Sequence, residues 1–182
     1  MRKVIESTLI SVDGVIGDPH TWTGEHFGQE AIARALEQLR HTDAMLMGRH
    51  TYEMFSRLWA APTDEYAAAI YQLPKFVFSS TLREASWHNT TVINGDVAGT
   101  VRALKQRDGQ DIVVYGHGAV GAQLLAEGLL DELRLWIHPV VMGSGRPFFV
   151  DGARADLALA DVQTTATGVV IVTFHPARPV TG

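Results

Sequence analysis

The sequence predicts one α/β domain with a mixed, mostly parallel central sheet, and three observations support this fold class. Short runs rich in β-branched residues alternate with helical patterns along most of the chain. Over the last third the rhythm changes, and two neighbouring β-rich runs indicate a closing antiparallel hairpin. The length of 182 residues suffices for one domain with a sizeable core and falls short of two domains.

The first half of the chain is predicted to hold three strands and three helices. Residues 4–12 form the first strand, and the Asp13–Gly14 pair after it is typical of a turn. Apolar residues spaced by three and four predict the helices, and a proline ends the last of them. The predicted helices cover 28–40, 49–59 and 64–73, and the other two strands cover 44–47 and 75–80.

The second half is predicted to complete the sheet. Asp96 is placed to cap a helix that carries Val97, Val101 and Leu104. The tail at 176–182 has two prolines and no apolar periodicity, so we expect one domain over 1–175 followed by a flexible end. The remaining predictions are strands at 90–94, 111–116 and 132–141, a helix at 119–128, and a hairpin formed by DLALADVQTT and 168–174.

The composition argues against several classes of function. A formal net charge of −5 disfavours a nucleic-acid partner. Without cysteine, the chain has no disulfide, thiolate nucleophile or cysteine-ligated zinc. The eight histidines form no HExxH pair, so we expect no metal site. We see no signal peptide and no apolar run of about 18 residues, and therefore expect a cytoplasmic protein without membrane contact that acts on a small molecule.

The segment MGRHTYE at 47–53 is the first chemical signal. A predicted strand ends here, and Gly48, Arg49, His50 and Thr51 open a helix. The first turn of a helix offers unpaired N–H groups and the positive end of the helix dipole, which favour a phosphate. Arg49 adds a permanent cation. The other interpretation is a simple strand–helix turn with a solvated arginine.

The segment GHGAVG at 116–121 is the second signal. It is a G-x-G-x-x-G pattern between a predicted strand and a predicted helix, the context in which such loops hold a pyrophosphate. A Rossmann dehydrogenase would also need an acidic residue about 20 positions further on. Asp131 and Glu132 come too early for that role, so a conventional NAD-type dehydrogenase is the weakest hypothesis.

Together these motifs resemble the dihydrofolate-reductase superfamily. The resemblance runs from about residue 4 to residue 174 and includes TLISVDGVIG, MGRHTYE, LPKFVFSS and IVVYGHGAVGAQLL. The stretch at 129–149 is similar to the branch related to the C-terminal reductase domain of the riboflavin-pathway deaminase/reductase. The resemblance implies a dihydrofolate-reductase-like three-layer fold, with helices on both faces of the sheet, and NADPH as cofactor. In relatives the region after 132–141 often supports a dimer, so we expect a homodimer.

The resemblance also assigns cofactor-binding residues. Those expected to hold the 2′-phosphate and pyrophosphate are Gly48, Arg49, His50 and Thr51, with Ser79 and Ser80 beside the adenosine phosphate. Those expected in the second glycine loop are Gly116, Gly118, Ala119 and Val120. His117 departs from the small residue common there, and either narrows the loop or donates to a phosphate. Ile16 and Gly17 are expected to line the nicotinamide.

The substrate is less defined than the cofactor. Folate reduction needs a carboxylate on the first long helix, and that position falls at about Ile32, with Glu30 nearby. We therefore expect no true dihydrofolate reductase activity. Candidate substrate contacts are Glu30, Tyr52, and Trp22 and His26 in a loop that also carries Phe27. Water and Asp13 are the candidate proton donors, and the alternative role of Asp13 is that of a turn residue.

The sequence thus predicts an NADPH-dependent reductase that transfers hydride to a small conjugated heterocycle, either pterin-like or pyrimidine-like. One alternative is the 5-amino-6-(5-phosphoribosylamino)uracil reductase of riboflavin biosynthesis. Another is a dimeric protein that binds NADPH without catalysis.

Overall fold

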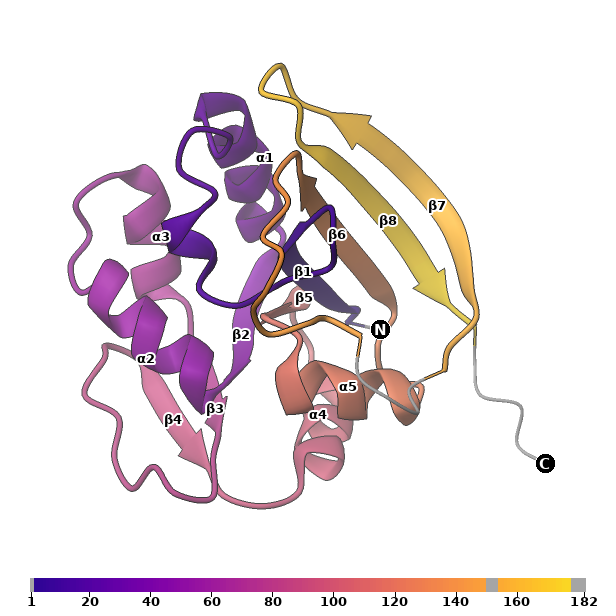
Figure 1. The fold of residues 1–182 in the computed structure, drawn as a ribbon. Coiled ribbons are helices and arrows are strands. Elements are labelled where there is room, and N and C mark those ends of the chain that lie inside the picture. Colours follow the sequence, from indigo (N-terminus) through magenta and orange to yellow (C-terminus); the bar gives the residue numbers. More distant parts are fainter. Residues whose placement is uncertain (1, 150–153, 178–182) are drawn as a thin grey trace.

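An eight-stranded sheet forms the centre of the computed structural model, which describes residues 2–149 and 154–177 (Figure 1). The strand order is β4-β3-β2-β5-β1-β6-β8-β7. β8 pairs antiparallel with both β6 and β7, and all other neighbouring strands are parallel. The predicted mixed sheet with a C-terminal hairpin is therefore confirmed. The strands are β1 Val4–Ser11, β2 Thr42–Gly48, β3 Lys75–Phe78, β4 Thr90–Ile93, β5 Asp111–Tyr115, β6 Glu132–His138, β7 Leu157–Thr164 and β8 Val170–Pro176.

Helices cover both faces of this sheet. From β1 to β4 the chain moves toward one edge, and from β4 to β6 it moves back. Because crossovers between parallel strands are right-handed, this reversal puts the two sets of helices on opposite faces. The first set is α1 Gln29–Arg40, α2 Arg49–Leu58 and α3 Glu65–Gln72, and the second is α4 Val97–Gln106 and α5 Gly118–Ala126. Figure 1 shows the two sets on either side of the sheet.

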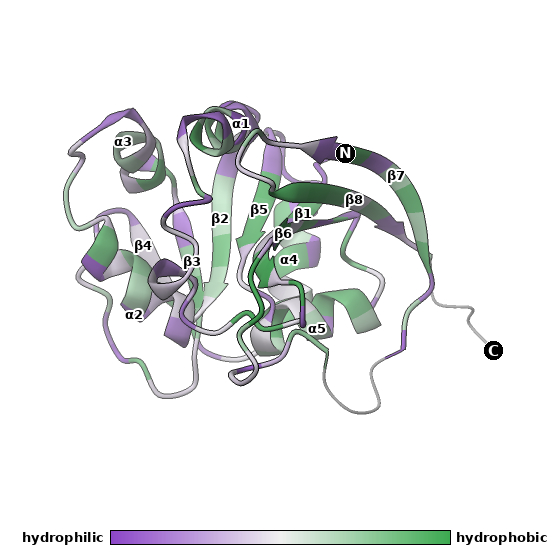
Figure 2. Ribbon diagram, turned by 45° about the horizontal axis from the view of Figure 1, so that its top comes forward, coloured by the Kyte–Doolittle hydropathy of each residue, from purple (hydrophilic) through white to green (hydrophobic). Residues whose placement is uncertain are grey.

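The central strands are buried on both faces, and alternate side chains enter two separate cores. In β2, Ala44 and Leu46 pack with α4 and α5, whereas Met45 and Met47 pack with α2 and α3. Strands covered on both sides read as continuous apolar runs, and Figure 2 shows β5 as mostly hydrophobic. This explains why AMLM and DIVVYG were recognisable as strands.

The helices begin in two different ways. Asp64 and Asp96 cap α3 and α4 by accepting hydrogen bonds from backbone N–H groups, which confirms the prediction for Asp96. The residues before α2 and α5 are Gly48 and His117, and neither makes a side-chain cap. The first N–H groups of α2 and α5 therefore have no side-chain acceptor in the described part of the chain.

Several predicted boundaries differ from the structure by one to three residues, and two of them are informative. The strand expected at 132–141 ends at His138, because Pro139 follows and has no N–H for the ladder. The tail is predicted to start at 176, but Pro176 is the last residue of β8, and the N–H of Ala177 donates to the carbonyl of Asp156. Residues 178–182 lie outside the described residues. Within 2–149 and 154–177, no helix has the length and apolar character needed to cross a membrane.

Candidate active site

The predicted site residues gather at one edge of the sheet. β1, β2, β3, β5 and β6 all run parallel, so their carboxyl ends meet at the same edge. The segments at 13–17, 48–51, 79–81 and 116–120 each follow one of these ends. In open α/β sheets this edge is where ligands bind.

The two glycine-containing loops touch each other there. A Cβ added to Gly116 would lie 2.6 Å from the hydroxyl oxygen of Thr51, and one added to Gly48 would lie 3.8 Å from a methyl of Val120. Gly116 also has a φ of 74°, a left-handed conformation that favours glycine. The structure therefore brings together the starts of α2 and α5, which are far apart in the sequence.

Arg49 reaches from the start of α2 toward the end of β3. Its Nη1 donates to the Thr81 hydroxyl at 2.8 Å, and its Nε donates to Glu53 at 2.6 Å. The Ser79 hydroxyl accepts the N–H groups of Thr81 and Leu82 and so shapes this turn. Ser80 is exposed beside it. Sequence reasoning missed Thr81, although a third hydroxyl directly after SS at a strand end was a usable signal.

His117 has a different role from the one expected. Its side chain is buried, its Nδ1 bonds Glu6 at 2.9 Å, and its ring stacks on Phe148 at 4.0 Å. A Cβ on Gly121 would collide with the Glu6 carboxylate, so the glycine leaves room for this pair. His117 thus anchors the glycine loop from inside, and its contact with a phosphate stays a prediction. Ala119 is exposed at the start of α5.

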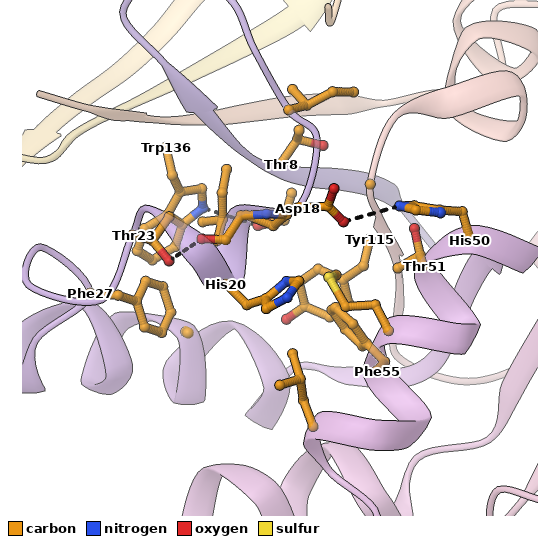
Figure 3. Close-up of a pocket in the computed structure, with 18 of the residues that line it drawn as sticks. Thr8, Asp18, His20, Thr23, Phe27, His50, Thr51, Phe55, Tyr115 and Trp136 are labelled. Atoms are coloured by element: carbon orange, nitrogen blue, oxygen red, sulfur yellow. Dashed lines mark hydrogen bonds and ion pairs between the residues drawn. The ribbon is translucent and has the colours of Figure 1, made fainter. Parts of the chain in front are cut away.

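A cavity of about 370 Å³ opens beside the two loops (Figure 3). His50, Thr51 and Gly116, which belong to the two glycine-containing loops, line one side of the cavity together with Ile16. Gly17 is not part of the lining. A Cβ added to Gly17 would lie 3.3 Å from the backbone nitrogen of Arg146, so Gly17 packs closely against that residue. The volume is in the range of small-molecule sites.

Six aromatic side chains form a continuous wall around this cavity, which we call the aromatic wall. Neighbouring ring centroids lie 4.4–6.3 Å apart from the first member to the last, the usual range for aromatic pairs. In order along the wall, the members are Trp136, Phe27, Tyr66, Trp59, Phe55 and Tyr115. They come from five separate elements of the chain, so their assembly had no local sequence signal.

The loop between β1 and α1 lines the cavity. Of the three loop residues named from the sequence, Phe27 is in the lining, and His20 and Thr23 join it. Trp22 instead donates its indole N–H to the carbonyl of Gly17, and its ring meets that of His138. His26 bonds the carbonyl of Thr167. Neither Trp22 nor His26 lines the cavity, and both pack within the loop, so their substrate contacts stay predictions.

Glu30 and Tyr52 are also structural. Glu30 accepts the N–H of Ala166 at 2.9 Å and pairs with Arg34, so it holds the β7–β8 turn. Tyr52 is buried, and its hydroxyl accepts the N–H of Ser86 at 3.1 Å. The side chain of Tyr52 packs against the 82–87 segment, whereas the side chain of Phe55 lines the cavity.

Asp13 ties two loops together. Its carboxylate accepts the Ser11 hydroxyl and the N–H groups of Met142 and Gly143 at 2.7–3.0 Å. These bonds, that of Ser11 first, lower the pKa of Asp13 to about 2. A group ionised at neutral pH has no proton to donate, and Asp13 does not line the cavity. These contacts support the alternative role of Asp13 in the turn, and its role as proton donor stays an untested prediction.

Among the described residues, no three histidine, aspartate or glutamate side chains are grouped closely enough to hold a metal ion. The titratable groups that line the cavity are Asp18, His20, His50 and Arg146, together with two tyrosines. On the side of the two glycine-containing loops, Nε2 of His50 lies 3.7 Å from Oδ1 of Asp18.

The sheet order, the closing hairpin and the two glycine loops at the carboxyl edge define a dihydrofolate-reductase-like α/β protein. The chain belongs to the RibD C-terminal domain family, whose profile matches residues 2–172. Uncharacterized protein YyaP of Bacillus subtilis is 32% identical over 143 residues, covering 75% of this chain and 76% of YyaP.

Two solved structures share the fold. A putative riboflavin biosynthesis protein from Shewanella sp. PV-4 superposes with a TM-score of 0.73 at 20% identity, covering 98% of this chain and 100% of that one. Dihydrofolate reductase from Enterococcus faecalis, solved with NADP(H), gives a TM-score of 0.61 at 15% identity and covers 96% of both chains.

Proposed function

We propose that this protein is an NADPH-dependent reductase that transfers hydride to a small conjugated acceptor. The observation that carries the proposal is the contact between the loop at Gly48–Thr51 and the loop at Gly116–Val120. Membership of the RibD C-terminal domain family and the NADP(H)-bound dihydrofolate reductase among the structures with this fold support the same class of chemistry.

The phosphate end of the site fits an anionic dinucleotide. Two helix N-termini without side-chain caps, those of α2 and α5, meet at the same place, and each offers unpaired N–H groups and a positive dipole end. Arg49 adds an exposed guanidinium at the end nearer β3, with Thr81 beside it. Because the whole chain is acidic, this local cation is what would attract the 2′-phosphate.

The other end of the site fits a hydride transfer. NADPH, when bound, supplies hydride from C4 of its nicotinamide. Ile16 and the backbone at Gly116 would position that ring, and the aromatic wall would keep water away from the acceptor. Asp18 is the one carboxylate among the described lining residues, and it is exposed. We therefore assign the proton to solvent, delivered after the hydride.

A second candidate is the reduction of a phosphoribosylamino-uracil in riboflavin biosynthesis. The family match and the putative riboflavin biosynthesis protein with the same fold favour it. Its test is direct turnover of that uracil with NADPH. Turnover faster than that of all uncharged acceptors would establish it in place of the proposal above.

The proposal is tested by fluorescence titration with NADPH and NADH of the wild type, Arg49→Ala and Arg57→Ala. Arg57 lies on the same helix, is exposed and bonds the carbonyl of Glu53, so it is a matched control. We expect NADPH affinity to fall about 5- to 30-fold in Arg49→Ala only, the scale of a lost charge-assisted bond. Equal affinities for NADPH and NADH in the wild type would overturn the proposal.

A further inference from the structure

Among the residues described, no carboxylate, arginine or lysine side chain lies on the side of the cavity formed by the aromatic wall. Besides the aromatic wall, Ala35, Met54 and Leu58 line the cavity, and the imidazole of His20 lies between Phe27 and Phe55 (Figure 3). Burial raises the pKa of Tyr66 to about 12 and also raises the pKa of Tyr115, so both hydroxyls stay neutral. A ligand at this end therefore meets mainly aromatic and aliphatic side chains, with no carboxylate, arginine or lysine of the described residues beside it.

The charged lining residues lie elsewhere. His50 and Thr51 occupy the opposite side of the cavity from Phe27 and Trp136, with Asp18 next to His50 (Figure 3). These groups belong to the side where the proposed cofactor enters. Arg146 approaches the same region through its backbone, whose carbonyl accepts the N–H of Ile16.

Helix α1 supplies no counter-charge either. Its residue in the cavity wall is Ala35, one turn beyond Ala31, which is buried against the ring of Trp136. The charged residues of this part of the helix, Glu30 and Arg34, pair with each other at 2.9 Å and bond the β7–β8 turn. Neither is aimed at the cavity. A carboxylate for a pterin, or an arginine or lysine for a phosphate, is thus missing from this side of the cavity among the residues described.

We propose that the acceptor reduced at this site is an uncharged, planar, conjugated ring compound, recognised by aromatic packing rather than by ion pairing. The inference rests on the proposed NADPH function, because the cofactor is taken to occupy the other side of the cavity. Burying an unpaired charge is costly, whereas flat apolar rings stack favourably on aromatic side chains. The wall therefore selects against phosphorylated and other ionic acceptors.

The chemistry balances with no further co-reactant. For an enone, the C4–H bond of the nicotinamide breaks and its hydride forms a C–H bond at the β-carbon. The electron pair of the C=C bond moves to the carbonyl oxygen as an enolate, and water protonates the α-carbon. The acceptor gains two electrons, and NADPH becomes NADP⁺.

The test uses three matched ring compounds: benzylideneacetone, its ring-carboxylated analogue and its ring-trimethylammonium analogue. Binding is read from quenching of tryptophan fluorescence in the wild-type protein saturated with NADP⁺, since Trp59 and Trp136 belong to the wall. We expect the neutral compound to bind at least 10-fold more tightly than either charged one.

A charge added to the cavity lining should change this order of affinities. Leu58 lines the cavity but is 47% exposed, so Leu58→Lys should fold. We expect it to strengthen binding of the carboxylated compound at least 3-fold. The control is Ala60→Lys, which adds the same charge at an exposed position outside the lining, and should leave the wild-type order.

The outcomes separate the inference from the proposed function. Equal binding of neutral and charged compounds, tighter binding of a charged one, or no binding of the neutral one would overturn the inference. Failure to saturate with NADPH or NADP⁺ in a prior titration would instead overturn the proposed function.

Discussion

Gly116→Ala is the substitution that most sharply tests the contact between the two glycine loops. Two costs add at this position. An L-residue at a φ of 74° costs about 1–2 kcal/mol, and a Cβ 2.6 Å from the Thr51 hydroxyl adds an overpacking cost of about 1–3 kcal/mol. We therefore expect Gly116→Ala to lower the free energy of unfolding by about 2–5 kcal/mol.

Gly118 provides the matched control for that substitution. It also has a positive φ, of 48°, but an added Cβ would meet nothing within 4 Å. Gly118→Ala should therefore cost only the backbone term, about 1–2 kcal/mol. Made in a Thr51→Ala background, Gly116→Ala should recover the overpacking part, because the colliding oxygen is gone.

Two assays follow these variants. Urea denaturation gives the unfolding free energies, and fluorescence titration gives the NADPH affinity. We expect Gly116→Ala to bind NADPH at least 10-fold more weakly than Gly118→Ala, since the collision displaces the start of α2. Equal stabilities for the two variants would refute the contact between the loops.

Two further predictions concern buried and hydrogen-bonded charges away from the cavity. Lys75 is 1% exposed and donates to the carbonyls of Tyr71, Leu73 and His88. Lys75→Met should therefore lower the free energy of unfolding by about 2–4 kcal/mol, as measured by urea denaturation. It should leave the NADPH affinity unchanged. Burial lowers the pKa of Lys75 from 10.5 to about 8. The free energy of unfolding of the wild type should therefore rise as the pH increases from about 8 to 10.5, whereas that of Lys75→Met should stay flat. Identical profiles of unfolding free energy against pH would contradict this. Asp13→Asn should lower the melting temperature but leave the pH dependence of NADPH oxidation unchanged, because Asp13 is ionised in the fold. The stability from Asp13 is fully present above pH 3.8 and is lost as the pH falls through about 2; loss of an activity pKa in Asp13→Asn would restore it as a proton donor.

Most of the fold was predictable because its strands are local in sequence and strongly apolar. Continuous runs such as 111–115 have no alternative explanation as surface elements, and glycines marked where parallel strands ended. Boundaries were less accurate, since Pro139 ends β6 earlier than the apolar run does. The predicted homodimer and cytoplasmic location stay predictions.

In the candidate site, too, features formed by short local segments were predictable and features formed by distant segments were not. The glycine loops and Arg49 were recognisable because each works through a short local segment. The aromatic wall was not, because its six residues meet only after five elements of the chain pack together. The structural contacts of Tyr52, Glu30 and His117 could not be predicted for one shared reason: sequence position says which element a residue belongs to, but not which way its side chain faces.

The central claim is that the chain catalyses hydride transfer from NADPH rather than only binding it. The most direct measurement uses NADPH carrying deuterium at C4 of the nicotinamide, incubated with the enzyme and a panel that includes benzylideneacetone and dihydrofolate. We expect deuterium on a carbon of a reduced product, with benzylideneacetone favoured over dihydrofolate, at a rate lowered by Arg49→Ala. Tight binding of NADPH with no deuterium transferred to any acceptor would contradict the claim and identify a non-catalytic NADPH-binding protein.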